Sequence, residues 1–366
     1  MGIAPTSPAA MRLEERRRRL VDPPRFLGLV VLLVFVLAPV VVPSFQLTDL
    51  LMRIALFATL AASYDVVIGY TGIVSFGHVM FFGLGAYAVA LSVGKWGAPT
   101  YGHLVGGLAA GIAVAAAVAG LIGAFSLRVK ALFFAMITLA FAEFALILAV
   151  QLSGVTGGED GVSPRLPGVF AAGFSGGEFL GIAVSGRLVS YYGLLAVCLG
   201  LFAAMSRFVH SPLGRALPAI RDNELRAEAL GYRTFVLQII SSTFASAVAA
   251  AVGGCYTAWV RYVNPESTLG IPLMLDVLLM VIIGGLGTLY GGLVGAALLL
   301  TARTLLPDLR GLATWLAPQS EILGRLSERW LLYFGILFIL VVFFFPRGVI
   351  GTIRERWPGS TSSPAP

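Results

Sequence analysis

The stretch SPLGRALPAIRDNELRAEALGYR, Ser211 to Arg233, decides how this chain is organised. It is the longest charge-dense segment between hydrophobic runs, and the stretches on either side of it, Leu188–Ala204 and Thr234–Val260, carry no charge. An apolar run of ~20 residues is long enough to cross a bilayer as a helix. The segment is therefore expected to be a loop on one face of a membrane.

Local signals predict that this loop is structured. Ser211 is a helix-capping residue, and Pro212 suits a first helical position because its missing N–H would have no partner there. Asp222 and Asn223 are suited to cap a second short helix, which would end at Gly231. Apolar side chains recur at helical spacing in the first helix: Leu213, Ala216, Leu217 and Ile220. Two interpretations stay open on the residues alone: a basic loop with some helicity, or an element that docks a soluble partner.

The composition sets the class of protein. The chain is 58% hydrophobic and 12% charged, whereas soluble domains carry about 25% charged residues. A polytopic, all-α integral membrane protein is expected, with about 8–10 transmembrane helices. The net charge of +7 comes mostly from arginines near the expected spans, because the only lysines are Lys95 and Lys130, so it does not indicate nucleic-acid binding. Cys198 and Cys255 lie in apolar runs and are expected to be small buried residues, with no disulfide and no metal site.

The apolar runs divide the chain into a basic cytoplasmic segment (1–25), a transmembrane domain (26–346) and a disordered cytoplasmic tail (347–366). Arginine-rich loops mark the cytoplasmic side of a membrane. The loop 151–187 has few basic residues and is expected outside, while the loop 207–233 and both termini are expected in the cytoplasm. The expected spans are Phe26–Val42, Leu50–Ile68, Gly69–Val93, Leu104–Leu127, Leu132–Val150, Leu188–Ala204, Phe235–Val260, Leu273–Ile283, Leu289–Leu306 and Trp330–Phe345.

Two glycine-rich stretches share one spacing. Ile68-Gly69-x-x-Gly72-x-x-x-x-Gly77 matches Ile283-Gly284-x-x-Gly287-x-x-x-x-Gly292. Glycine-interrupted helices at corresponding places point to a transport site, because the freed backbone groups must face a cavity or protein. A chance match among 44 glycines is the other interpretation. The stretch 273–306 also stays open between two crossings and one long broken helix.

No catalytic chemistry is evident. Neither lysine lies in a phosphate-binding G-x-x-x-x-G-K-[ST] context, and there is no H-E-x-x-H motif or nucleophile elbow. Four ionisable residues are expected inside the membrane: Asp65, His78, Glu143 and Asp276. They are few and separated, so hydrogen bonding between helices is favoured over a proton relay, with Glu143 as the residue most in need of a partner.

Four collinear motifs carry a specific resemblance: the segment Ser211–Arg233, DVVIGYTGIVSFGH (65–78), TGGEDG (156–161) and MVIIGGLG (280–287). Together they resemble permeases of ABC importers for branched-chain amino acids, of the LivM type. The resemblance covers roughly Leu50 to Leu300. In this chain Glu228-Ala229 is followed directly by Leu230-Gly231, closer than the general importer pattern, and Pro218 is expected to interrupt the first helix of the loop.

The resemblance implies a multi-pass protein of the bacterial inner membrane and a set of partners. A second, similar permease would form a heterodimer with this chain, two cytoplasmic ATP-binding subunits would dock on the loop, and an extracytoplasmic binding protein would deliver the substrate. The chain would not be an enzyme and would bind no cofactor or metal itself; its partners would use ATP and Mg. It also implies coupling residues, namely Leu213, Leu217, Arg221, Glu224, Glu228, Leu230 and Gly231.

Residues for a translocation path are expected from the glycine breaks and the ionisable side chains: Gly69, Gly72, Gly77, His78, Glu143, Gly284, Gly285 and Gly287. Permeases for urea or short-chain amides share this fold, so the substrate stays open between these classes. A third interpretation, an ion-coupled secondary carrier, would require ion-linked carboxylates inside the membrane. No clustered catalytic set supports a membrane enzyme.

Overall fold

The computed structural model describes residues 23–42, 44–94, 100–128, 131–170, 175–179, 182–316, 330–345 and 348–356. The chain divides into two compact units, residues 1–51 and 52–366. The first unit holds α2 (Pro23–Val41) and the first turns of α3 (Phe45–Asp65). Most described side chains of α2 are exposed and apolar, and Pro39 lies inside the helix.

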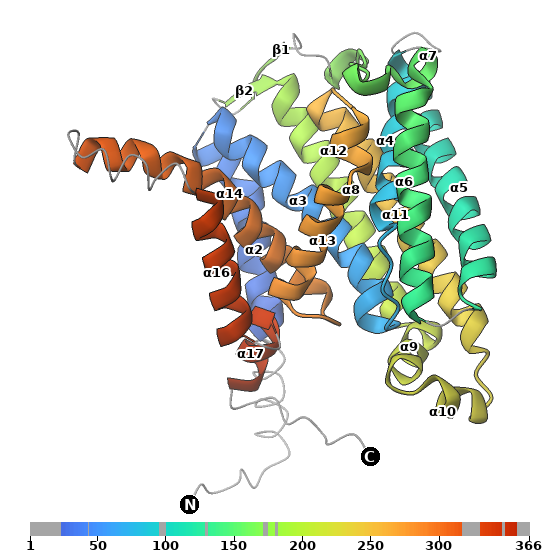
Figure 1. Ribbon diagram of the computed structural model, residues 1–366. Coiled ribbons are helices and arrows are strands. Elements are labelled where there is room, and N and C mark those ends of the chain that lie inside the picture. Colours follow the sequence, from blue (N-terminus) through green and yellow to red (C-terminus); the bar gives the residue numbers. More distant parts are fainter. Residues whose placement is uncertain are drawn as a thin grey trace, which may run out of the picture. The chain divides into compact units, whose positions relative to one another are not determined.

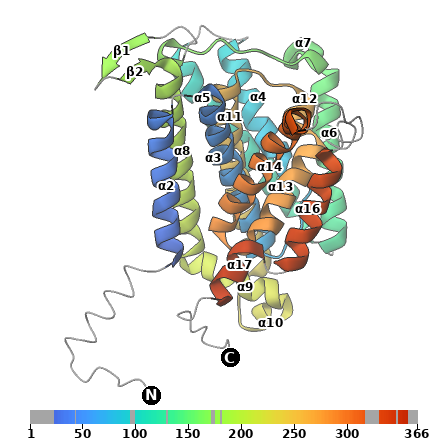
Figure 2. The ribbon, with the colours of Figure 1, turned by 90° about the vertical axis from the view of Figure 1, so that its left-hand side faces the viewer.

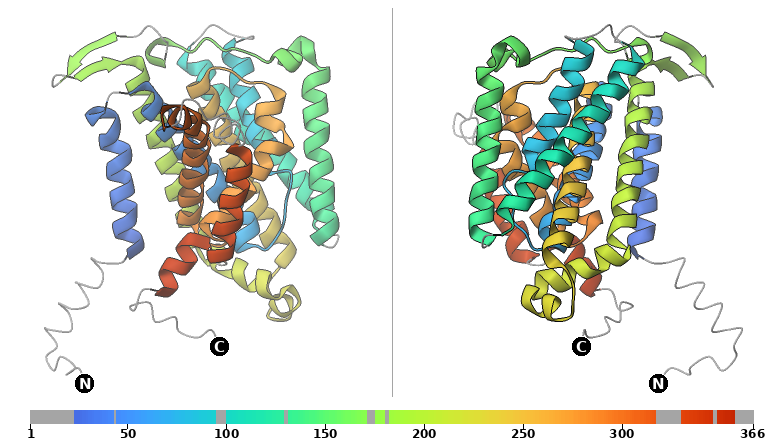
Figure 3. Two further views of the ribbon diagram at one scale, coloured as in Figure 1. Left: turned by 60° about the vertical axis from the view of Figure 1, so that its left-hand side comes forward. Right: turned by 90° about the vertical axis from the view of Figure 1, so that its right-hand side faces the viewer.

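The centre of the second unit is formed by α4 (His78–Gly94), α5 (Tyr101–Ser126) and α11 (Thr234–Val260), which pack side by side along their lengths (Figure 3). Small residues make this approach possible. A Cβ atom at Gly85 would collide with the Ala250 carbonyl group, and one at Gly253 would collide with the Phe82 carbonyl group. Backbone contact of this kind is how membrane helices associate without a hydrophobic driving force between them.

The helix that begins as α3 does not continue into α4. It passes into one turn of π-helix, η1 (Val66–Tyr70), and then into the non-helical stretch Thr71–Gly77. That stretch finds its hydrogen bonds in the protein: the Ile73 N–H donates to the Val67 carbonyl (3.2 Å), and the Phe76 N–H donates to the Thr138 hydroxyl (3.1 Å). Irregular backbone at membrane depth is tolerated only in such surroundings. The expected crossing Gly69–Val93 is therefore a shorter helix that follows a break.

The second glycine-rich stretch is the turn of an antiparallel hairpin. α13 (Ile271–Gly284) and α14 (Leu289–Leu316) pack closely, with Gly284 against the Gly291 carbonyl and Gly295 against the Met280 carbonyl. This register settles the question left open by the sequence: residues 273–306 form two helices, not one long broken helix. Figure 2 shows α16 (Trp330–Phe344) and α17 (Gly348–Arg356) beside this hairpin.

One end of this unit carries the short elements α7 (Ser153–Thr156), η2 (Gly158–Asp160) and η3 (Gly168–Phe170), which follow α6 (Ala131–Gln151). Two short antiparallel strands, β1 (Ser175–Phe179) and β2 (Ile182–Ser185), lead into α8 (Gly186–Val209). The otherwise helical chain thus contains one small hairpin that the sequence did not predict.

The motif TGGEDG, 156–161, lies in this region and is held by the loop before α12 (Pro265–Leu269). Val162 and Val263 form a two-bond β-bridge of 2.8 and 3.0 Å, and the Tyr262 hydroxyl donates to the Asp160 carbonyl at 3.0 Å. Figure 1 shows α7 at the opposite end of these helices from α9 (Pro212–Asp222) and α10 (Glu224–Ala229).

Among the described residues, six helices are long and apolar enough to cross a membrane, and three shorter apolar helices (Leu32–Val41, His78–Gly94 and Leu289–Leu305) accompany them. The polytopic all-α class is confirmed. A count of eight to ten crossings would require shorter helices to cross as well.

The expected disordered tail is wrong for residues 348–356, which form α17. This helix packs against α13 and α14, and Gly348, at φ 74°, lies directly on the Gly285 backbone. A tail with Val349 and Ile350 at its start has apolar surface to bury, which a purely polar tail lacks. The expected basic segment lies mostly, and the end of the tail wholly, outside the described residues.

Candidate functional site

The segment Ser211–Arg233 forms two helices, as its capping signals predict. The Ser211 hydroxyl accepts from the Gly214 N–H (3.1 Å) at the start of α9, and the Asn223 side chain accepts from the Arg226 N–H (2.9 Å) at the start of α10. Gly231 follows with φ 91°. Pro218 does not interrupt α9; the bend falls at Asn223, which adopts an extended conformation. The loop is therefore not one continuous helix, and the interruption lies at Asn223 rather than at Pro218 as expected.

Leu217 does not face outward. It is 1% exposed and belongs to a small core formed within the segment and against α11, with Tyr70 and Phe208 packed on it; the buried members are Ala216, Leu217, Ile220, Ala227 and Leu237. The expectation that Leu217 contacts a partner is wrong, because a side chain already buried in its own chain has no surface to offer. Its place is to hold α9 against the membrane helices.

Glu224 and Glu228 also bind within the chain. The Gln238 amide donates to Glu224 Oε1 (3.0 Å), and the Thr234 hydroxyl donates to Glu228 Oε1 (2.7 Å). Both partners lie on the first turns of α11. The two carboxylates therefore fasten α10 to α11. Both residues stay exposed, so their expected role in orienting a docked partner stays a prediction.

Three large apolar side chains of the segment remain exposed, Leu213 (45%), Leu225 (79%) and Leu230 (72%). Single exposed leucines are ordinary on protein surfaces. Three on one compact polar element, with Tyr232 also exposed, make a surface of the kind that a partner covers. The sequence pointed to Leu213 and Leu230 but not to Leu225.

Arg221, near the end of α9, reaches the first glycine break. Its Nη1 donates to the Gly69 carbonyl at 2.6 Å, and its aliphatic stem packs on Gly72, whose φ is 78°. A Cβ atom at Gly72 would lie 2.6 Å from the Arg221 Cγ. The π-helical turn frees carbonyl groups from their regular partners, and the guanidinium takes one of them. The Arg221 side chain also contacts Asp222 at 3.2 Å on its exposed side.

Asp65 joins the two glycine breaks. Its Oδ1 accepts from the Gly287 N–H at 2.8 Å, in the turn between α13 and α14, and Gly69 leaves no room for a Cβ between Asp65 and Gly287. Gly285 (φ 111°) and Gly287 (φ 77°) supply the turn, and Gly284 ends α13. We call Asp65, Gly69, Gly72, Gly284–Gly287 and Arg221 the glycine junction.

The other expected path residues lie elsewhere. Gly77 packs on the Thr138 carbonyl of α6, and His78 is buried at the start of α4, where its Nε2 is hydrogen-bonded to the Ser63 hydroxyl (2.9 Å). Glu143 is half-buried on α6, which packs chiefly on α4, α5 and α12. The structure thus joins five of the eight expected path residues in the junction and does not bring these three to it.

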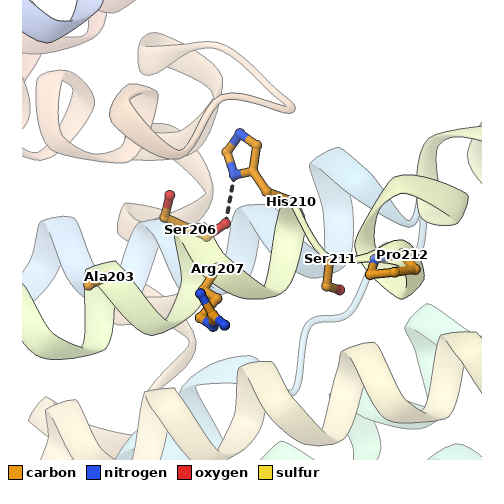
Figure 4. Close-up of a pocket in the computed structure, with 6 residues that line it drawn as sticks. All are labelled: Ala203, Ser206, Arg207, His210, Ser211 and Pro212. Carbon is orange, nitrogen blue, oxygen red and sulfur yellow. Dashed lines mark hydrogen bonds between the residues drawn. The ribbon is translucent and has the colours of Figure 1, made fainter.

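An open cavity of about 660 Å³ adjoins the start of α9 (Figure 4). Its lining is the corner between α8 and α9: Ala203, Ser206, Arg207, His210, Ser211 and Pro212. His210 Nδ1 donates to the Ser206 carbonyl at 2.6 Å, which closes the last turn of α8. The sequence marks Ser211 and Pro212 as residues of a helix start but does not predict a cavity here, because each lining residue also fits an ordinary helix end.

Asp276 also has a charged partner that was not predicted from the sequence. Arg303 on α14 forms an ion pair with it, at 2.5 Å, inside the membrane-spanning hairpin. Arg303 lies within the expected span Leu289–Leu306, so a charge inside an otherwise apolar run was the available signal.

Residues 46–344 match the model of a family described as "Branched-chain amino acid transport system / permease component". The chain belongs to this family. Membership makes it a transport permease component rather than an enzyme, and a multi-pass membrane protein.

Curated relatives include two bacterial proteins named "High-affinity branched-chain amino acid transport system permease protein LivM". The chain is 30% identical to that of Escherichia coli (strain K12) and 29% identical to that of Salmonella typhimurium, in each case over 90% of this chain and 76% of the relative. A "Probable branched-chain amino acid transport permease protein LivM" of Methanocaldococcus jannaschii is 26% identical over 62% of this chain and 61% of that protein. No solved structure matches.

Proposed function

We propose that this permease component imports branched-chain and other hydrophobic amino acids across a bacterial inner membrane, driven by ATP that separate subunits hydrolyse. A second permease would complete the translocation path, two ATP-binding subunits with Mg would dock in the cytoplasm, and an extracytoplasmic protein would deliver the substrate. The observation that carries the proposal is the bond from Arg221 of α9 to the Gly69 carbonyl, because it connects the polar loop directly to the broken helices.

The glycine junction supports a mechanical route for the coupling. α9 is seated on the membrane helices by its buried face, so a push on its exposed face moves it as a body. Arg221 would pass that movement to η1, and Asp65 would pass it on to the Gly284–Gly287 turn. Broken helices with left-handed glycines are places where a chain changes direction without unfolding a helix. The α13–α14 hairpin is thus the moving part in this proposal.

The exposed leucines support the site of docking. Burying a leucine contributes about 1.5–3 kcal/mol, and apolar anchors usually dominate protein interfaces. Leu213, Leu225 and Leu230, together with Tyr232, are the large apolar side chains that the segment exposes. The surrounding arginines would steer association more than they stabilise it.

The double variant Leu225→Asp/Leu230→Asp tests the proposal. In vesicles containing the complete complex, it should retain less than a tenth of the ATP hydrolysis stimulated by loaded binding protein, and co-purification of the ATP-binding subunits should fall in parallel. Leu217→Ala is the matched control for loss of folding, because it hollows the core of the loop and lowers thermal stability. Unchanged assembly and hydrolysis in the double variant would refute docking on this surface.

Two alternatives make different predictions. Import of urea or a short-chain amide would leave leucine uptake absent while the same loop variants still uncouple hydrolysis. A secondary carrier would lose uptake when an uncoupler dissipates the ion gradient and would keep it when ATP is depleted. Against a carrier, Asp65 and Asp276 are already engaged, by a backbone N–H and by an arginine.

A further inference from the structure

The α13–α14 hairpin contains a charged pair within its apolar surface. Arg303 donates from both terminal nitrogens to both carboxylate oxygens of Asp276, at 2.5 Å each, which is the bidentate fork geometry. The Arg303 guanidinium carbon also lies 5.6 Å from the centroid of the Phe334 ring on α16. Three helices therefore meet at this pair.

The pair lies well inside the expected thickness of the membrane. Asp276 is eight residues before Gly284, which corresponds to about 12 Å along a helix. In the register of the α13–α14 hairpin, Leu299 is the residue opposite Asp276, and Arg303 lies one helical turn after Leu299. Side chains on a helix tilt toward its N-terminus, so the long side chain of Arg303 can reach back to Asp276. Charges at such depth are costly and normally face a protein interior or a water-filled path.

The pair is not sealed. The Arg303 side chain is 38% exposed and that of Asp276 is 12% exposed. An arginine side chain with this much open surface in an apolar hairpin needs a polar neighbour for its charged end, since lipid chains offer none. The hairpin that holds the pair ends at the glycine junction, so the same turn that Asp65 fastens controls how α13 and α14 lie together.

We propose that Asp276 and Arg303 form a binding site for the zwitterionic backbone of an α-amino acid. The guanidinium fork matches a carboxylate, and the Asp276 carboxylate matches an ammonium group. In the closed state each charge serves as the other's partner; when the hairpin shifts, a passing zwitterion replaces both at once. This inference rests on the proposed function for its substrate class, and it adds the residues that recognise the substrate.

The charge-swapped variant Asp276→Arg/Arg303→Asp separates recognition from a purely structural pair. It preserves an ion pair between the two helices but exchanges the positions of the groups that would bind the carboxylate and the ammonium group of the substrate. The expected result is leucine uptake reduced more than tenfold, with normal assembly and normal hydrolysis stimulated by loaded binding protein. Uptake above half of the unmodified rate would overturn the proposal.

The conservative variant Arg303→Lys keeps the test decisive if the swapped variant fails to fold. It retains the charge but not the fork, so uptake should fall at least fivefold while thermal stability in detergent stays within a few degrees. Unchanged uptake would overturn the proposal.

A direct readout distinguishes failure of this site from failure of the proposed function. The thermal stability of the full-length purified chain is measured with millimolar L-leucine, 3-methylbutylamine, 4-methylpentanoate or urea. The site predicts stabilisation by leucine alone, lost in Arg303→Lys, whether or not hydrolysis couples to transport. Equal stabilisation by the amine or the acid, or none by leucine, contradicts the site; stabilisation by urea alone contradicts both the site and the amino-acid substrate.

Discussion

Gly72 and Gly287 hold matching positions in the two glycine-rich stretches and have nearly the same backbone angle, φ 78° and φ 77°. Both lie against Arg221. A Cβ atom added to Gly72 would press on the aliphatic stem of Arg221, and one added to Gly287 would lie 3.3 Å from its Nη1. A side chain at either position would be strained by the left-handed conformation and would press on the residue that connects α9 to the breaks. The shared spacing therefore coincides with a shared local geometry.

Alanine at these two glycines should be harmful. Gly72→Ala and Gly287→Ala are each expected to lower uptake at least fivefold and to lower thermal stability, because positive φ costs an L-residue on the order of 1 kcal/mol or more. The control is Gly200→Ala in α8, which is a regular helix with open space at that position; it should be neutral or slightly stabilising. If Gly72→Ala and Gly287→Ala had the same uptake and melting temperature as Gly200→Ala, glycine would not be required at these two positions.

Arg221 supplies a polar bond from α9 to η1, through its Nη1 and the Gly69 carbonyl. A hydrogen bond to a charged group contributes about 1.5–3 kcal/mol, so Arg221→Gln should weaken the connection without altering the exposed face of α9. We expect assembly with the ATP-binding subunits to be retained and uptake per ATP hydrolysed to fall severalfold. Arg215→Gln, an exposed arginine on the same helix, is the matched control and should leave that ratio unchanged; equal ratios in both variants would exclude Arg221 as the connection.

At the scale of elements, local chemistry predicted α9 and α10 well and their surroundings poorly. Ser211, Pro212 and Asn223 act within one turn of their own positions, so their roles follow from the sequence. Leu217 faces its own chain because α11 and Phe208 lie behind α9, and nothing in the spacing of leucines says which side a neighbour occupies. The partners of Asp65 and Arg221 lie 222 and 152 residues away along the chain, so only the fold brings them together.

The attachment of α10 to α11 can be measured as a coupling between Glu224 and Gln238. Glu224→Ala and Gln238→Ala should each increase proteolytic cleavage within residues 224–233, because either change removes the 3.0 Å bond between them. The double variant should be little worse than either single one, since the bond can be lost only once. Fully additive increases would mean that the two residues act independently. Glu266→Ala, an exposed glutamate at the opposite end, serves as the control.

At the scale of the whole molecule, the arginine distribution predicts that the two ends of the helices lie on opposite sides of the membrane. The segment 207–233 contains five arginines, Arg207, Arg215, Arg221, Arg226 and Arg233, whereas 151–187 contains Arg165 and Arg187 beside three acidic residues. The structure contributes the geometry: in the second unit, α9–α10 and the α7–η2 region lie at opposite ends of the packed helices (Figure 1). Basic loops are retained on the cytoplasmic side, so α10 should be cytoplasmic and Gly158–Asp160 should be outside.

Cysteine labelling tests this orientation. The native cysteines should contribute little labelling, because Cys198 and Cys255 are only 3% and 4% exposed. Leu225→Cys and Glu159→Cys place thiols on exposed positions at the two ends. A membrane-impermeant maleimide should modify Glu159→Cys in intact spheroplasts and Leu225→Cys only in inside-out vesicles, with the unmodified protein unreactive in both. Labelling of Leu225→Cys in spheroplasts would invert the topology, and α9–α10 would then face the side without ATP. Labelling of both positions from one side would mean that α8 (Gly186–Val209), the one expected crossing between them, does not span the membrane.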